Sequence, residues 1–177
     1  NGNIRYGMNA DELYEIFSDY DIIATSSIFT VQTRMHFEIA KIAKKVAKEN
    51  SKQILTVSGG VNARSLREHF LSNGFDIIAL GEGERTIVQI VEEFSSKQPD
   101  YSNVERIAFR KNGKTIVTSA PHRKATKFID HLPRPAIDAM PLEVYAKLGI
   151  PHWGLPLKDI KFSSMQTARG CQDACTF

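Results

Sequence analysis

Apolar runs alternate with amphipathic stretches over the first hundred residues. Three β-branched runs predict strands: YDIIATSSI (20–28), QILTVSGG (53–60) and DIIALGEGE (76–84). Helices are predicted before, between and after them, at residues 11–17, 31–50, 63–74 and 85–96. In the longest of these, Met35, Ile39, Ile42 and Val46 share one face at helical spacing. Strands so continuously apolar are typical of burial on both faces, so we expect an α/β fold with a parallel sheet and flanking helices.

The alternation ends after Pro99. VERIAFRKNGKTIVTS (104–119) alternates in polarity and turns at Asn112–Gly113, which predicts a hairpin at the sheet edge. Residues 121–156 contain six of the seven prolines, which indicates an ordered, proline-rich linker with a short helix near 142–147. DIKFSSMQTARG (159–170) predicts one more strand. We therefore divide the chain into an α/β domain (1–120), a linker (121–158) and a final segment (159–177).

Composition restricts the class of protein without defining a function. Of the 177 residues, 42% are hydrophobic and 24% charged, as in ordinary globular domains. The net charge of +3 gives no electrostatic case for nucleic acid or membrane binding. There is no signal-peptide pattern and no run long enough for a membrane span. Two cysteines at close spacing are no secreted disulfide framework, so the cytoplasm is the expected location.

The carboxyl ends of the three predicted strands carry the first candidate chemistry. They are small or hydroxylated: Ser26–Ser27, Ser58–Gly59–Gly60 and Gly81–Glu82–Gly83. Ligands of open parallel sheets bind outside these ends, where glycines admit a close approach and helix N-termini favour anions. A tight turn alone would explain one glycine pair, but three such exits in a row favour a ligand edge. Dinucleotide and Walker A motifs do not occur.

The histidines and carboxylates of the sequence give little further indication of a functional site. The five histidines form no metal-binding pattern, and His36 and His69 are expected to be ordinary surface or half-buried helix residues. Glu84 is suited to the first turn of the following helix, where it complements the dipole. For Glu82, backbone capping and ligand contact are both open.

Cys171 and Cys175, spaced C-x3-C, are the only two cysteines of the chain. Alone, such a pair fits chance placement on a helix, a thiol–disulfide pair, or part of a metal site. A redox pair is more often C-x-x-C. The preceding strand, Arg169–Gly170 and the following Phe177 favour the metal site, because iron–sulfur clusters are held by closely spaced thiolates on a loop.

Several segments together resemble one family. RGCQDACTF is similar to the opening of the radical S-adenosylmethionine (SAM) signature C-x3-C-x2-C, whose last cysteine would be position 178. The upstream part resembles the cobalamin-binding domain of the B12-dependent class. Ser26-Ser27-Ile28 is similar to its S-x-L motif and Gly59–Gly60 to its glycine pair. DIIALGEGERTIVQIVEEF resembles its D-x-V-x-x-GEGE-x-T segment, and LPRPAIDAMPLEVY its proline-rich bridge.

The resemblance implies a Rossmann-like, flavodoxin-like B12-binding sheet followed by the first strand and cysteine loop of a radical SAM barrel. Cys171 and Cys175 would be two of three ligands of a 4Fe–4S cluster that cleaves SAM. The implied cobalamin-binding residues are Ser26, Ser27, Thr30, Gly59, Gly60, Gly81, Glu82 and Gly83. The parent protein would be an iron–sulfur oxidoreductase of the methyltransferase or cyclase type, with an unknown substrate.

The family pattern is incomplete in this chain. The first strand–helix–strand of the domain, including the D-x-H-x-x-G loop, and the barrel after its first strand are missing. We therefore expect an exposed sheet edge with self-association or weak order there. We also expect neither a stable cluster nor turnover from this chain alone. The alternative is a non-catalytic α/β scaffold that binds no corrin, in which side chains such as Phe29 or Arg64 would fill the space at the strand exits.

Overall fold

The computed structural model describes residues 7–119, 132–148, 159–161, 163 and 169. The chain divides into two compact units, Asn1–His122 and Arg123–Phe177. Cys171, Cys175 and most of the predicted strand 159–170 lie outside the described residues.

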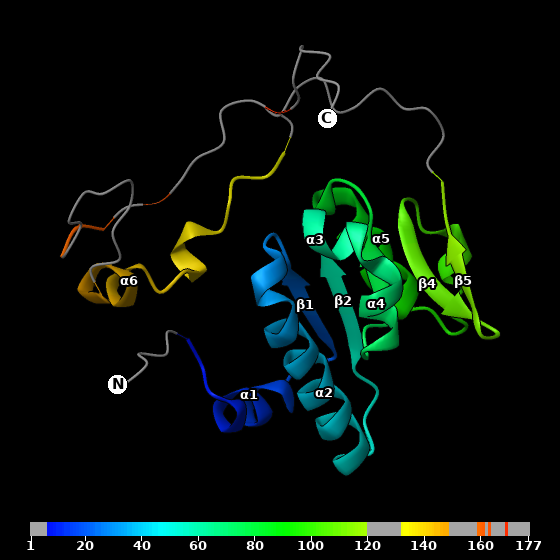
Figure 1. The fold of residues 1–177 in the computed structure, drawn as a ribbon, viewed down its shortest axis with the longest axis horizontal. Coiled ribbons are helices and arrows are strands. Elements are labelled where there is room, and N and C mark those ends of the chain that lie inside the picture. The colour runs from blue at the N-terminus through cyan, green and yellow to red at the C-terminus, as the bar shows by residue number, and fades with distance from the viewer. Residues whose placement is uncertain (1–6, 120–131, 149–158, 162, 164–168, 170–177) are drawn as a thin grey trace. The chain divides into compact units, whose positions relative to one another are not determined.

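The first unit contains one five-stranded sheet with strand order β1-β2-β3-β4-β5. Its strands are β1 (Ile22–Ser26), β2 (Leu55–Gly59), β3 (Ile77–Ala79), β4 (Ile107–Lys111) and β5 (Lys114–Val117) (Figure 1). The first three strands are parallel, whereas β4 and β5 run antiparallel to their neighbours as a hairpin. The predicted α/β fold with a parallel core and an edge hairpin is confirmed, and the hairpin makes the whole sheet mixed.

Helices connect and cover these strands. They are α1 (Ala10–Phe17), α2 (Thr33–Glu49), α3 (Gly60–Ser65), α4 (Arg67–Ser72) and α5 (Gly83–Phe94), with short 3-10 turns η1 (Thr30–Gln32) and η2 (Tyr101–Asn103). The predicted helix 63–74 is two helices that meet at Leu66, whose φ of −104° and ψ of 29° are not helical. This break allows Ala63 from α3 and Phe70 from α4 to enter the same core.

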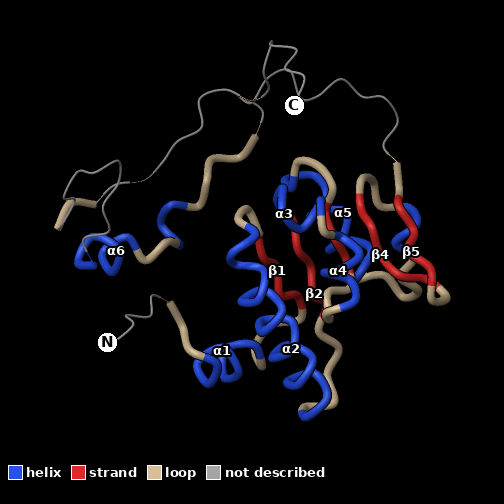
Figure 2. Tube along the Cα trace, in the orientation of Figure 1, coloured by secondary structure: helices blue, strands red, loops and turns tan. Residues whose placement is uncertain are grey.

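Helices lie on both faces of the sheet (Figure 2). On one face, residues of α2, α3 and α4 pack on β3 and β4 around Phe70, which is fully buried. On the other face, Ile90 of α5 packs on β2, β3 and β4. A third cluster joins α1 and the later half of α2 to β1. The three clusters therefore hold helices against both faces of the sheet.

The buried face of α2 differs from the predicted one. Ala40 and Ala43 have no exposed surface, whereas Met35, assigned to the buried stripe, is 58% exposed. Small side chains let a helix axis come close to a sheet. Ile39 and Ile42 are partly buried in the cluster that contains α1. The apolar surface of α2 is thus divided between the sheet and α1.

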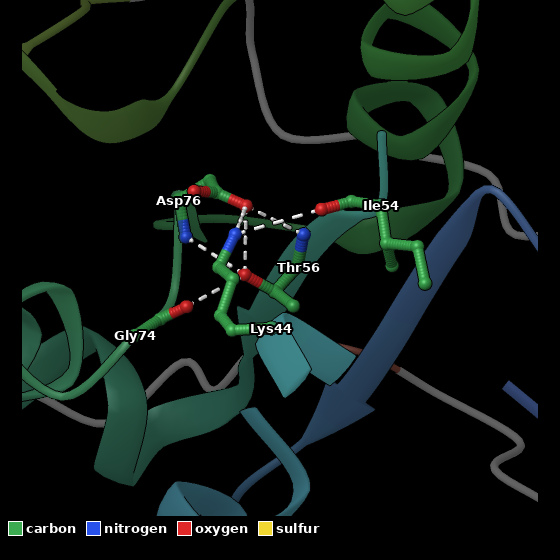
Figure 3. Close-up of polar contacts among 5 residues, drawn as sticks. All are labelled: Lys44, Ile54, Thr56, Gly74 and Asp76. Atoms are coloured by element: carbon green, nitrogen blue, oxygen red, sulfur yellow. Dashed lines mark hydrogen bonds and ion pairs between the residues drawn. The ribbon is translucent and has the colours of Figure 1, made fainter. Parts of the chain in front are cut away.

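A polar cluster lies where β2 and β3 begin (Figure 3). Asp76 Oδ2 accepts hydrogen bonds from Thr56 N at 2.8 Å and from Lys44 Nζ. The Thr56 hydroxyl lies 2.8 Å from Asp76 Oδ2 and from the Gly74 carbonyl oxygen. Lys44 Nζ also lies 3.5 Å from the Ile54 carbonyl oxygen. This cluster, which we call the amino-end latch, ties α2 to the starts of two neighbouring strands.

Within the described part of the chain, β1 forms one edge of the sheet. Ile23 is buried, whereas Ala24 and Ser26, which point to the opposite face, are exposed. Strand β1 is therefore covered on one face only, and its outer backbone edge is not paired with another described strand.

In the second unit, the described elements are η4 (Ile137–Ala139) and α6 (Leu142–Leu148). Helix α6 corresponds to the short helix predicted near 142–147. Lys161 Nζ lies 2.6 Å from Glu143 Oε1, and Asp159 N donates to the Ala146 carbonyl oxygen at 2.8 Å.

Candidate functional site at the strand exits

The parallel register places the first two predicted exits side by side. Ser26 is paired with Gly59, and Thr25 with Ser58, whose hydroxyls lie 3.1 Å apart. Helix α3 begins directly after β2, at Gly60 (Figure 1). The third exit, Gly81–Gly83, follows the neighbouring parallel strand β3 and leads into α5. We call the carboxyl ends of β1, β2 and β3, with the residues that follow each, the exit edge.

Residues 27–32, the exit loop, are fixed to α3 by a buried polar cluster. Ser27 N donates to the Gly59 carbonyl oxygen at 2.8 Å, and Asn62 N donates to the Ser27 carbonyl oxygen at 3.1 Å. The Asn62 amide donates to Ser27 Oγ at 2.8 Å and to Thr33 Oγ1 at 2.9 Å. The Ser27 hydroxyl therefore lies inside the protein, in a residue with no exposed surface.

Asn62 and Thr33 are two residues of this cluster that were not predicted from the sequence. Both are polar residues that are almost completely buried, with exposed fractions of 4% and 8%. A polar residue two positions after the glycine pair was the available signal for Asn62. Its partners in the first exit lie 29 and 35 positions away in the chain, so only the fold brings them together.

One of the exit glycines, Gly60, is required by the chain itself. Gly60 has φ +87°, and a Cβ there would collide with the Ser27 carbonyl group. A Cβ on Gly81 would lie 2.9 Å from Cδ of Arg106, whose side chain lies over that exit. At Gly83, in contrast, nothing lies within 4 Å of the added Cβ. Close approach by a ligand is therefore not needed to explain Gly60. At Gly81 the neighbour is a flexible side chain that can move, and the space beside Gly83 is open.

The surface of the exit edge combines polar groups with large apolar side chains. Five of the eight predicted binding residues are exposed: Ser26, Thr30, Gly81, Glu82 and Gly83. Gly59 and Gly60 are partly buried. Beside them, the exposed fractions of the apolar side chains are 55% for Ile28, 62% for Phe29, 90% for Val31 and 51% for Val61. Apolar surface with a few placed polar groups is typical of cofactor sites.

Phe29 and Arg64 are the two side chains on which the choice between a cobalamin site and a scaffold was expected to depend. A scaffold was expected to fill the exits with such side chains. Both residues are exposed instead, and neither belongs to a core cluster. Both side chains are therefore part of the exposed surface near the exits.

His36, one turn after Thr33 on α2, is buried, which corrects the expectation of a surface or half-buried residue. Its side chain is 8% exposed, and Nδ1 has no hydrogen-bond partner among the described residues. Burial disfavours the charged imidazolium and so lowers the pKa of His36 below its usual 6.5. The imidazole is therefore neutral at neutral pH.

No group of three or more histidine, cysteine or carboxylate side chains that could hold a metal ion occurs among the described residues. Within the same part of the chain, no helix is both long and apolar enough to cross a membrane. The predicted cluster ligands Cys171 and Cys175 fall outside it, so their arrangement stays a prediction.

The fold and the exit edge define the class as an α/β protein with a B12-binding-like sheet, and comparisons with known proteins agree with this class. No protein-family model matches the chain. Over 165 residues it is 27% identical to the uncharacterized methyltransferase PH0819 of Pyrococcus horikoshii. The match covers 90% of this chain and 31% of that protein, so the chain spans about a third of the length of its curated relative.

Two solved structures share the fold. The cobalamin-dependent SAM radical enzyme OxsB, with aqua-cobalamin and SAM bound, matches 75% of this chain with a TM-score of 0.63 and 20% identity. The radical SAM methyltransferase TsrM from Kitasatospora setae matches 62% with a TM-score of 0.52 and 12% identity. The matches cover 18% and 21% of those proteins. This chain therefore has the fold of one part of cobalamin-dependent radical SAM enzymes.

Proposed function

We propose that this chain is the cobalamin-binding region of a B12-dependent radical SAM enzyme. The observation that carries the proposal is the exit edge, where the register places Ser26 beside Gly59 and leaves hydroxyls and apolar side chains exposed together. The fold shared with OxsB, whose structure contains aqua-cobalamin and SAM, supports the same function.

The predicted binding residues divide into two roles. The exposed hydroxyls of Ser26 and Thr30 would hydrogen-bond polar groups at the corrin periphery or nucleotide tail, and Gly81, Glu82 and Gly83 would flank it. Exposed Phe29 and Val31 would cover apolar corrin surface and exclude water from it.

Ser27, Gly59 and Gly60 would instead form the framework beneath, because the Ser27 hydroxyl is buried and Gly60 lies against the Ser27 carbonyl group. When bound, cobalamin would carry a methyl group or assist a ring-forming or rearranging step. The protein would contribute the positioning of the bound cofactor.

In the parent enzyme, Cys171 and Cys175 would provide two of three thiolates to a 4Fe–4S cluster, which leaves one iron for SAM. The name of the curated relative favours methyl transfer as the reaction class. With two of the three ligands, the 177-residue chain is expected to retain no stable cluster after anaerobic incubation with iron and sulfide. A stable visible absorption band after desalting would contradict this.

Titration with hydroxocobalamin tests the proposed function. We expect a change in the visible spectrum that saturates at one equivalent, and retention of the corrin on desalting. The matched variants are Gly83→Leu, which places a side chain into open space at the exit edge, and Gly113→Leu at the distant hairpin turn. Gly83→Leu is expected to weaken binding, whereas Gly113→Leu should bind normally at temperatures where it remains folded. If the wild-type chain shows no spectral change and does not retain the corrin, the proposal of cobalamin binding is wrong. The non-catalytic α/β scaffold would then be the remaining interpretation.

A further inference from the structure

We infer that Asn62 is a positioning residue, which holds the exit loop in the shape that presents its apolar side chains to a ligand. The inference deepens the proposed function and rests on it for the identity of the ligand. It concerns a residue that makes no contact with the ligand itself, because its side chain is buried beneath the exit edge.

The geometry uses both hydrogens of the Asn62 amide. One is donated to Ser27 Oγ at 2.8 Å, at the end of β1, and the other to Thr33 Oγ1 at 2.9 Å, in the first residue of α2. The two acceptors bracket the exit loop. The backbone N–H of Asn62 also donates to the Ser27 carbonyl oxygen at 3.1 Å. Asn62 of α3 therefore makes two hydrogen bonds at the start of the loop and one just after its end.

Burial makes these bonds decisive for the shape of the loop. Ser27, Asn62 and Thr33 are 0%, 4% and 8% exposed. Water cannot readily replace a hydrogen bond at such sites, so loss of one partner leaves the other unsatisfied, which is unfavourable in a buried position. Hydrogen bonds are also directional, whereas apolar contacts tolerate rearrangement. The cluster therefore specifies one loop conformation.

The loop has little other support. Its large apolar side chains, Ile28, Phe29 and Val31, are all more than half exposed, and none belongs to a core cluster. Apart from the 3-10 turn Thr30–Gln32, the hydrogen bonds that fix the loop within the described part of the chain pass through Ser27, Asn62 and Gly59. Without the Asn62 amide, Phe29 and Val31 would lose their fixed position at the exit edge.

Thr33→Val and Asn62→Leu test the inference in the 177-residue chain. Thr33→Val is isosteric and removes one acceptor, and Asn62→Leu removes both side-chain bonds at similar volume. We expect hydroxocobalamin affinity to fall at least tenfold in Asn62→Leu and severalfold in Thr33→Val. Amide hydrogen exchange in residues 28–32 should accelerate in both variants.

Asn73→Ala is the matched control. Asn73 donates its side-chain amide to the His69 carbonyl oxygen at 2.8 Å, at the end of α4, and makes no contact with the exit loop. It should lower stability without changing affinity or exchange in residues 28–32. This control separates positioning from a general loss of stability.

The outcomes distinguish the inference from the proposed function. If the wild-type chain binds no cobalamin, the proposed function fails, and the exchange measurement still decides whether Asn62 fixes the loop. If the wild-type chain binds and both variants bind equally well, the positioning role is wrong. Unchanged exchange in residues 28–32 of Thr33→Val, the variant that preserves packing volume, would also overturn it.

Discussion

At the scale of single residues, Gly60 shows how the chain shapes its own candidate site. The left-handed φ of +87° would strain any other residue, and a Cβ would in addition collide with the Ser27 carbonyl group. We expect Gly60→Ala to lower the free energy of unfolding by about 3 kcal/mol, the sum of a strain of about 1 kcal/mol and an overpacking cost of about 2 kcal/mol.

Gly113→Ala is the matched control in urea denaturation. Gly113 has φ +76° in the hairpin turn, but nothing lies within 4 Å of its added Cβ. Gly113→Ala should therefore lower the free energy of unfolding only by the cost of the backbone strain, about 1 kcal/mol. Equal losses in the two variants would show that the collision with Ser27 is relieved by a small shift of the backbone.

His36 makes stability depend on pH. The unfolded chain, with the usual pKa of 6.5, takes up a proton at higher pH than the folded chain, in which burial lowers the pKa of His36. The contribution to stability is therefore complete above pH 6.5 and decreases as the pH falls toward the lowered folded pKa. Chemical denaturation between pH 7.5 and 5 should show this decrease, and His36→Leu should reduce it. An identical pH profile in the variant would contradict the assignment.

At the scale of elements, the amino-end latch joins α2, β2 and β3. Asp76→Ala would leave the Thr56 N–H without its acceptor and Lys44 without its ion-pair partner. Both charged side chains are a little under two-fifths exposed, so part of this loss is compensated by water. We expect a loss of about 2 kcal/mol in the free energy of unfolding.

Glu38→Ala provides the comparison. The Lys41–Glu38 pair is spaced i, i+3 on α2, and both side chains are 64% exposed. Exposed pairs contribute about 0–1 kcal/mol, so this variant should remain close to wild type in the same denaturation assay. If Asp76→Ala costs no more than Glu38→Ala, the latch is not a stabilising element.

At the scale of the whole molecule, β1 is expected to promote self-association, because its outer edge is not paired with another strand among the described residues. Ala24→Lys places a charge on its exposed face, and we expect this variant to be more monomeric than wild type in concentration-dependent light scattering. Ser102→Lys adds the same charge to an exposed residue of η2, outside the sheet, and should behave like wild type. A wild-type chain that is monomeric at all concentrations would contradict the expectation.

Much of the fold follows from local patterns. The structure contains a strand within each of the three apolar runs, the hairpin that turns at Asn112–Gly113 and the short helix predicted near 142–147. The errors arose where tertiary packing competes with periodicity. Spacing alone could not show that Ala40 and Ala43, rather than Met35, face the sheet, or that the helix after Gly60 breaks at Leu66.

For the candidate site, the sequence by itself determined which residue types occur at the strand exits, because small and hydroxylated residues follow apolar runs at fixed positions. Only the tertiary structure decided their roles. It buried Ser27 and exposed Ser26, although they are adjacent, because Ser27 lies beyond the end of β1 against α3, where it hydrogen-bonds Asn62, while Ser26 lies on the same exposed face of β1 as Ala24. It also joined Asn62 to Ser27 and Thr33 across about thirty residues of chain, since such contacts depend on the parallel register of β1 and β2 and not on local sequence.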